Sequence, residues 1–427
     1  MATDLVANAC QLITDKLKQE ISTPYSSNSD PAIIRNDRHI LAALHTCLLY
    51  LPSSPSDCLP TITILVDHVV RELYNYPHED VPEYWRRIHT DASIIKAICE
   101  AKLARDKTDW KNVVKTIDVA LVMSGAPGGR RDMMLDLIGE VEKVLAEIEE
   151  NEDRHNNDCV DEPQPLQQPY ISYPVPRHST PPSISFFTSH IASSRQPIII
   201  ESSLSHWPAL SSRPWSDLDY LTTLVGKHRQ VPVEIGSKYT DDDWMQKFVS
   251  FGDYVQLIKT SDRCKDKYEK DHQECVTSDS SAKQQIAYLA QHNLFFQIPR
   301  LLDDIITPDY CFVDTGCSSE DDSMDVDINA WFGPSGTVSP LHTDPTHNLL
   351  AQVAGTKYVR LYAPEESYKL YPFDHNKTLG NTSQVDVESP DIAKFPLFES
   401  ARYKECLLSP GDLLYIPAGG IMFDRLV

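Results

Sequence analysis

Positive charge is scarce in this chain of 427 residues. Its 39 lysines and arginines are set against 62 aspartates and glutamates, which gives a formal net charge of -23 at pH 7. Non-specific binding to nucleic-acid phosphates needs a basic face, so this balance argues against a protein that binds DNA or RNA directly. It permits a basic partner such as a peptide rich in Arg or Lys, although an acidic solvated surface is the simpler explanation of the charge.

Long apolar runs and paired cysteines are also missing. Apolar runs such as 198–200 and 413–416 have the length of a strand and not of a bilayer span. The first six residues lack the basic region and apolar run of a secretory signal. The ten cysteines include no Cys-x-x-Cys pair, so we expect free thiols in a reducing compartment. These absences predict a soluble intracellular protein with no membrane partner.

Three segments of different character divide the chain. Residues 1–150 show helical periodicity, and the length of the chain favours two domains. Residues 151–183 are polar and then rich in proline, with few large apolar side chains to offset chain entropy, which predicts a disordered linker. From residue 184 to 427 the pattern changes to short apolar segments separated by turns.

These patterns predict an α+β protein, with a helical N-terminal module followed by a double-stranded β-helix of the jelly-roll and cupin kind. The alternative is a generic β-sandwich that serves as a binding domain and has no buried polar cluster. The predicted helices cover 3–21, 33–51, 62–74, 84–102, 110–122, 131–149, 241–259 and 281–305, with Pro60 in a break between helices. The predicted strands cover 196–201, 230–235, 327–332, 348–353, 357–362, 405–408 and 412–417. Residues 261–281 and 317–327 are predicted to be polar loops.

The pair His342 and Asp344 carries the chemistry of most interest. One imidazole and one carboxylate are two of the three ligands that hold Fe(II) on one face in non-haem oxygenases. At positions i and i+2 of a strand, both side chains point to the same side. Pro340 and Pro345 bracket the pair and restrict the backbone on either side. The pattern is short, and by itself it also fits a loop histidine and a turn aspartate without metal.

The third ligand that such a site needs is missing from the sequence. No histidine follows His375. His347 lies past Pro345 and is expected to point elsewhere, and His375 lies in a polar segment. Lys357, in a strand pattern, is expensive to bury without an anion, although strand alternation could equally turn it to solvent.

The chain resembles the JmjC-domain 2-oxoglutarate oxygenases over residues 184–417, in particular the subgroup known as lysine-specific demethylase 8 or JmjC arginyl hydroxylase. The segment NAWFGPSGTVSPLHTDPTHN at 329–348 carries most of the resemblance. Further matching segments are 195–200, 206–208, 231–241, 288–292, 352–362, 381–388 and 409–417.

The resemblance implies Fe(II) and 2-oxoglutarate as cofactors, O₂ as co-substrate, and a location in the nucleus or cytoplasm. It implies that His342 and Asp344 bind the iron. It implies that Lys357 holds the far carboxylate of 2-oxoglutarate, and the co-substrate residues that it implies beside Lys357 are Tyr288, Ser339 and Asn348. Glu234 and Trp331 match the pocket for the substrate side chain, where a carboxylate beside an aromatic face suits an Arg or Lys of a protein substrate.

The resemblance ends after Pro417. The family continues there with a Trp-His pair and further strands, whereas this chain reads AGGIMFDRLV. We therefore expect a β-domain that lacks its last strands and an iron site without its third ligand. The expected activity is hydroxylation or demethylation of a peptidyl arginine or lysine, impaired in this chain by an altered C-terminus. The alternative is an inactive isoform or interaction protein that works through its helical module.

Overall fold

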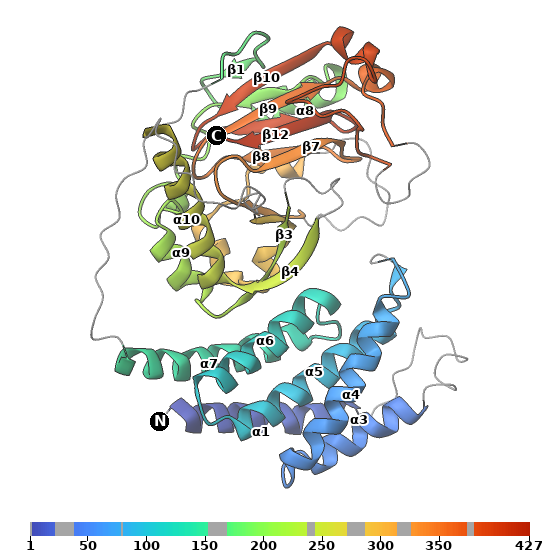
Figure 1. The fold of residues 1–427 in the computed structure, drawn as a ribbon, viewed down its shortest axis with the longest axis vertical. Coiled ribbons are helices and arrows are strands. Elements are labelled where there is room, and N and C mark those ends of the chain that lie inside the picture. The colour runs from blue at the N-terminus through green and yellow to red at the C-terminus, as the bar shows by residue number, and fades with distance from the viewer. Residues whose placement is uncertain are drawn as a thin grey trace, which may run out of the picture. The chain divides into compact units, whose positions relative to one another are not determined.

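The computed structural model describes residues 2–21, 38–77, 80–152, 169–236, 244–270, 287–313, 326–373 and 380–427. They form two compact units, which are treated separately (Figure 1). Unit 1 contains Met1–Val160 together with Gly226–Val231 and Ser250–Gly252, and unit 2 contains the remaining residues. Among the described helices, none has the length and hydropathy needed to cross a membrane.

Unit 1 is helical, as predicted for the N-terminal part of the chain. Its helices are α1 (Ala2–Ile21), α3 (Arg38–Tyr50), α4 (Pro55–Leu73), α5 (Glu83–Leu103), α6 (Lys107–Ser124) and α7 (Arg130–Glu152). Helix α5 packs between α4 and α6, and α1 packs on α7. The predicted break at Pro60 is wrong, because Pro60 lies within α4. Burial of Cys58, Ile62 and Leu65 on one face of α4 outweighs the single hydrogen bond that the proline removes.

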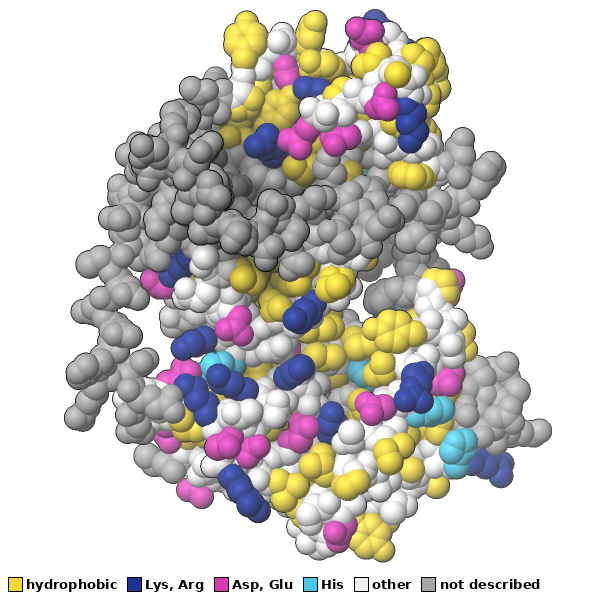
Figure 2. Space-filling model, in the orientation of Figure 1, with side chains coloured by type: hydrophobic (Ala, Val, Ile, Leu, Met, Phe, Trp, Pro, Cys, Tyr) yellow, Lys and Arg dark blue, Asp and Glu magenta, His cyan; other side chains and the backbone are white. Residues whose placement is uncertain are grey.

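Charged side chains cap a helix and join helices in unit 1. Helix α6 begins at Asp106, whose side chain accepts a hydrogen bond from the backbone N–H of Asp109, and ends at Gly125 in the left-handed conformation. The buried Arg130 donates to Asp91 of α5 at 2.7 Å and also pairs with Glu20 of α1. Figure 2 shows positive and negative side chains interspersed over the visible face of these helices.

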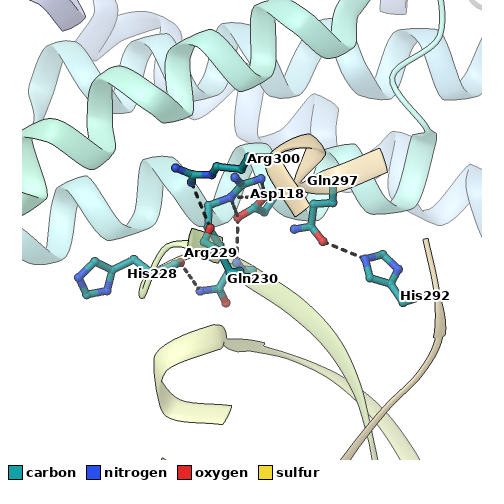
Figure 3. A network of polar contacts seen from close by, with 8 residues as sticks. Asp118, His228, Arg229, Gln230, His292, Gln297 and Arg300 are labelled. Carbon is teal, nitrogen blue, oxygen red and sulfur yellow. Dashed lines mark hydrogen bonds and ion pairs between the residues drawn. The ribbon is translucent and has the colours of Figure 1, made fainter. Parts of the chain in front are cut away.

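The inserted segment Gly226–Val231 is fixed to the helices of unit 1 by a buried ion pair (Figure 3). The Arg229 guanidinium donates to both carboxylate oxygens of Asp118 on α6, at 2.8 and 3.0 Å. The backbone N–H of Gln230 donates to the same carboxylate at 2.8 Å. Arg229 is 3% exposed and Asp118 is fully buried, so each charge depends on the other for compensation.

Unit 2 contains three four-stranded sheets. The first has the order β1-β2-β11-β8, the second β10-β9-β12-β7 and the third β4-β3-β5-β6. The strands are β1 (Arg177–His178), β2 (Ile198–Ile200), β3 (Gln230–Ile235), β4 (Met245–Ser250), β5 (Ala287–His292), β6 (Ala330–Phe332), β7 (Val338–Thr343), β8 (Asn348–Ala351), β9 (Lys357–Tyr362), β10 (Tyr403–Leu408), β11 (Leu413–Ile416) and β12 (Ile421–Leu426).

The first two sheets pack face to face, as expected for a cupin-like domain. Their shared core contains Ile199 and Leu414 from the first sheet with Val359, Leu361 and Leu408 from the second. The outer face of the first sheet is covered by α8 (Ile184–Ser193) through Phe187 and Ile191. The outer face of the second sheet is covered by the segment that contains Val385, Phe395 and Phe398. The prediction of an α+β protein with this architecture is confirmed.

Two predicted helices in unit 2, 241–259 and 281–305, are wrong in their N-terminal parts and are helical further along. Residues 245–250 form β4 before helix α10 (Phe251–Lys270), and residues 287–292 form β5. Segment 287–292 contains Ala, Leu and Gln, which favour helices locally, but it pairs with β3 and β6. Pairing and burial in a sheet override such propensities. Most of the predicted loop at 317–327 lies outside the described residues.

Two further differences concern the linker and the chain after Pro417. Within the predicted linker, Arg177–His178 form β1 and pair with β2, while residues 153–168 lie outside the described residues. Residues Ile421–Leu426, where we expected a gap in the β-domain, form β12 between β9 and β7. The alternation of buried Ile421 and Phe423 on one face explains why this segment can take that place.

Candidate functional site

The His342 side chain owes its direction to an irregularity in β7. On β12, Met422 pairs with His342 and Asp424 pairs with Ser339, so two steps on β12 correspond to three on β7. This β-bulge lets Ser339 and His342 face the same side of the sheet although they are three residues apart. Leu341, between them, packs into the outer core of the sheet.

Hydrogen bonds fix both His342 and Asp344, the two residues predicted to bind a metal. The carbonyl oxygen of Pro340 lies 2.7 Å from Nδ1 of His342 and can only accept, so Nδ1 carries the proton. The lone pair of Nε2 therefore remains for a metal. The Asn348 side chain donates to Oδ2 of Asp344 at 2.6 Å, which fixes the carboxylate. Asn348 thus contacts a proposed ligand directly.

The strand positions beside His342 offer no third nitrogen or carboxylate. Its partner on β12 is Met422, and Thr382 forms an isolated bridge with it on the other side. Within the described ranges, no group of three or more His, Cys, Asp or Glu side chains is placed to hold a metal ion. His347 stacks on Tyr415, and its Nδ1 accepts a hydrogen bond from the backbone N–H of Ala418. His375 lies outside the described residues.

Lys357 is buried and already has a carboxylate partner. Its ammonium group lies 3.0 Å from Oδ1 of Asp424, and both side chains are about 5% exposed. Lys357 begins β9 and Asp424 lies on the neighbouring β12, where Val359 of β9 is its register partner. The open question of whether Lys357 points to solvent is thereby answered, because the side chain lies inside the domain.

Tyr288 and Ser339 lie close to this ion pair. Burial raises the pKa of Tyr288 well above its usual range, and the nearby carboxylates of Asp424 and Glu234 raise it further. Ser339 faces the Tyr288 hydroxyl and lowers that pKa, yet the hydroxyl makes no hydrogen bond of normal geometry to any described residue. A buried hydroxyl without such a bond is unusual, and a hydrogen-bonding ligand or water would satisfy it.

Glu234 and Trp331 are on the sheet that carries Tyr288. Glu234 of β3 pairs in register with Tyr288 of β5, and Trp331 lies on the next strand, β6, with 44% of its surface exposed. Burial raises the pKa of Glu234. The aromatic residue that contacts Glu234 is Trp244, whose indole N–H lies 3.4 Å from the carboxylate. Trp244 was not among the residues predicted from the sequence.

Gly333 is a second residue that sequence reasoning missed. A Cβ atom at this position would lie 2.7 Å from the ring of Tyr288 and 3.0 Å from the Thr337 hydroxyl. Because real Cβ atoms do not come so close to a neighbour, a side chain at this position would displace Tyr288. The Phe-Gly-Pro run at 332–334 was a visible signal, since an isolated glycine in a strand pattern often marks a close approach.

Comparison with known proteins assigns the chain and its β-domain fold to a family. Residues 183–419 match the family model described as a cupin-like domain. Lysine-specific demethylase 8 of Danio rerio is 38% identical over 365 residues, covering 83% of this chain and 81% of that protein. The chain belongs to the JmjC family of cupin-like oxygenases.

Other JmjC proteins match over somewhat more than half of this chain. Lysine-specific demethylase 8 of Xenopus tropicalis is 46% identical over 55% of this chain and 46% of its own length. JmjC domain-containing protein D of Dictyostelium discoideum is 42% identical over 57% of this chain and 52% of its own length. The chain thus spans about half the length of these two relatives. Enzymes of the JmjC family are 2-oxoglutarate-dependent oxygenases and demethylases that generally use Fe(II).

The family's cofactors do not fit the described residues of this chain in full. His342 and Asp344 are the two expected ligands, and the side chain at the strand position opposite His342 is the thioether of Met422. Thioether sulfur is a soft donor that prefers Cu(I) to Fe(II). The buried cation that would hold a dicarboxylate is paired with Asp424. The chain keeps the cupin-like fold, and Met422 and Asp424 lie beside the residues that were expected to hold the metal and the co-substrate.

Proposed function

We propose that this chain has the scaffold of a JmjC oxygenase for a peptidyl arginine or lysine, and that its own turnover is impaired because a third iron ligand is missing. The observation that carries this proposal is the pairing of Met422 with His342 on adjacent strands. A histidine at position 422 would present a nitrogen to the same side of the sheet as Nε2 of His342. Methionine at that position leaves Fe(II) with two protein ligands.

The proposed substrate pocket is formed by Glu234 and Trp331, with O₂ entering the same cavity. A carboxylate whose neighbours are aromatic suits a guanidinium or ammonium group, through a charged hydrogen bond and a cation–π contact. Glu234 supplies that carboxylate and Trp244 an aromatic contact to it, while the exposed Trp331 is placed to meet an incoming chain. The net charge of -23 favours the approach of a basic protein substrate.

The activity of the family on such a side chain takes one of two forms. Hydroxylation of a side-chain carbon leaves a stable product with one added oxygen, whereas hydroxylation of an N-methyl carbon releases formaldehyde and ends in demethylation. Mass spectrometry of Arg- and Lys-containing peptides, with and without methyl groups, distinguishes these outcomes. The peptides are treated with Fe(II), 2-oxoglutarate, ascorbate and the double variant Met422→His and Asp424→Val, which also removes the carboxylate paired with Lys357. A gain of one oxygen identifies a hydroxylase, and loss of a methyl group identifies a demethylase.

Metal binding tests the proposal without turnover. Mn(II), which is paramagnetic and stable in air, is titrated into the wild-type chain, Met422→His and the matched control Met245→His, whose position on β4 is exposed. Loss of an outer partner of a metal ligand costs about 10–100-fold in affinity, so gain of a direct ligand should tighten Mn(II) at least about 100-fold. Equal Mn(II) affinity in the wild type and Met422→His would refute the proposal.

A second candidate function is a non-catalytic interaction protein, and the same Met422 favours it. Its working surface would be the helical region of unit 1. Under this alternative His342→Ala leaves the cellular phenotype of the protein unchanged, whereas loss of that phenotype in His342→Ala identifies a metal-dependent role.

A further inference from the structure

The ion pair between Lys357 and Asp424 places a carboxylate of the chain itself on the cation assigned to the co-substrate. The Lys357 Nζ to Asp424 Oδ1 distance is 3.0 Å, and both side chains are about 5% exposed. A lysine buried this deeply needs an anion, because an uncompensated charge in the interior is strongly unfavourable. In the described residues, Asp424 meets that need.

The surroundings of Asp424 match those expected around the far end of a dicarboxylate. Ser339 is the register partner of Asp424 on β7, and Tyr288 is near enough for the Asp424 charge to raise the pKa of its hydroxyl. The residues assigned to the far carboxylate of 2-oxoglutarate are thus gathered around a carboxylate already present. The Tyr288 hydroxyl still makes no hydrogen bond of normal geometry to any described residue. Asp424 therefore pairs with the Lys357 ammonium but leaves this hydroxyl without such a bond.

We propose that Asp424 acts as a built-in substitute for the far carboxylate of 2-oxoglutarate and keeps the co-substrate from Lys357. This inference rests on the proposed role of Lys357 in the oxygenase scaffold. The dianion 2-oxoglutarate, brought to this cluster, would meet an ion pair with no net charge and would be repelled by the Asp424 carboxylate. Asp424 is therefore a specificity-determining residue, and it acts independently of the missing iron ligand.

The first experiment measures 2-oxoglutarate binding by calorimetry, with Mn(II) present and absent. Asp424→Asn keeps the shape of the side chain and frees the charge of Lys357. Its affinity should rise about 10- to 150-fold, the range expected for one hydrogen bond to a charged group. The matched control is Glu388→Gln, which removes the exposed partner of Arg425 on β12, 3.0 Å away, and should leave binding unchanged.

A ligand control separates the far carboxylate from the rest of the co-substrate. 2-Oxobutyrate has the keto-acid end of 2-oxoglutarate and lacks the second carboxylate, so Asp424→Asn should not bind it more tightly than the wild type does. Equal 2-oxoglutarate affinity in folded Asp424→Asn and in the wild type overturns the inference.

A second variant covers the case in which Asp424→Asn does not fold. Lys357→Met together with Asp424→Leu replaces the pair by apolar side chains of similar size, a change that buried pairs commonly tolerate. Under the inference the wild type and this double variant bind 2-oxoglutarate equally weakly, because Lys357 is not available in either. Tighter binding by the wild type would show that Lys357 already serves the co-substrate and would overturn the inference.

The two proposals fail separately. A gain of 2-oxoglutarate binding in Asp424→Asn, without a gain of Mn(II) binding in Met422→His, supports the role of Asp424 and refutes the assignment of the third ligand position. The reverse pair of results refutes the role of Asp424 alone.

Discussion

Unit 1 should be sensitive to the loss of one partner of the buried ion pair between Asp118 and Arg229. Three hydrogen bonds of 2.8 to 3.0 Å join the guanidinium to the carboxylate, and a fourth, from the N–H of Gln230, ends on the same group. Asp118→Asn keeps the size of the side chain and removes its charge, which leaves Arg229 buried without full compensation. Breaking a buried pair in this way costs about 3–5 kcal/mol.

The assay is urea unfolding followed by tryptophan fluorescence. Trp110 is buried on α6, eight residues before Asp118, and Trp85 is buried on α5, so their emission reports on unit 1. With a slope of about 2 kcal/mol/M in urea, the expected loss moves the midpoint down by about 1.5–2.5 M. The two units can unfold separately, so the transition of these tryptophans is compared and not the whole unfolding curve.

Two variants decide whether the cause is the buried charge. Asp67→Asn removes an exposed carboxylate from α4 and should move the midpoint by less than about 0.3 M, as surface changes do. The double variant Asp118→Leu with Arg229→Met removes both charges and should recover most of the lost stability. A midpoint for Asp118→Asn within the range of Asp67→Asn would refute the reasoning.

Two shorter predictions concern other buried polar groups. Burial, with a smaller contribution from Lys96, lowers the pKa of His89 to about 4, so the unfolded chain binds its proton first as the pH falls below 6.5. The free energy of unfolding should therefore fall by about 3 kcal/mol between pH 6.5 and 4 because of this residue. The variant His89→Leu should flatten that fall, whereas the exposed control His45→Gln should not. An unchanged pH profile of stability in His89→Leu would contradict the assignment. The variant Tyr254→Phe removes the hydroxyl that accepts a hydrogen bond from the backbone N–H of Leu289 at 3.0 Å. Thermal unfolding of unit 2 should show a loss of about 1–3 kcal/mol in the free energy of unfolding. A loss below about 0.5 kcal/mol would mean that water replaces the hydroxyl.

The fold was predictable wherever a segment carried its own periodicity. The helices of unit 1 and strands such as β9 and β11 have apolar residues at the spacing of their element. Their described bounds lie within a few residues of the predicted ones, except that α4 begins at Pro55 and not at residue 62. Strand β5 was predicted as a helix because its local preference opposes its final state. Its pairing with β3 and β6 depends on segments far away in the sequence, which periodicity within one segment does not report.

The sequence predicted which residues form the candidate site, but it did not predict which side chains they contact. The i, i+2 spacing identified His342 and Asp344, and the burial cost of a lysine marked Lys357 as a residue in need of an anion. The identity of that anion, Asp424, depends on β12 lying between β9 and β7. A single aspartate in the otherwise apolar segment 421–424 was the available signal, and it was not recognised because no strand was expected after Pro417.

Succinate production tests the central claim most directly. The purified 427-residue chain, with Fe(II), 2-oxoglutarate and ascorbate, is compared with His342→Ala and with the double variant Met422→His and Asp424→Val, which replaces both residues that depart from an oxygenase site. The account predicts that the wild-type chain produces no more succinate than His342→Ala and that the double variant produces clearly more than either. Wild-type turnover well above that of His342→Ala would contradict the account and show that the site is complete without a histidine at position 422.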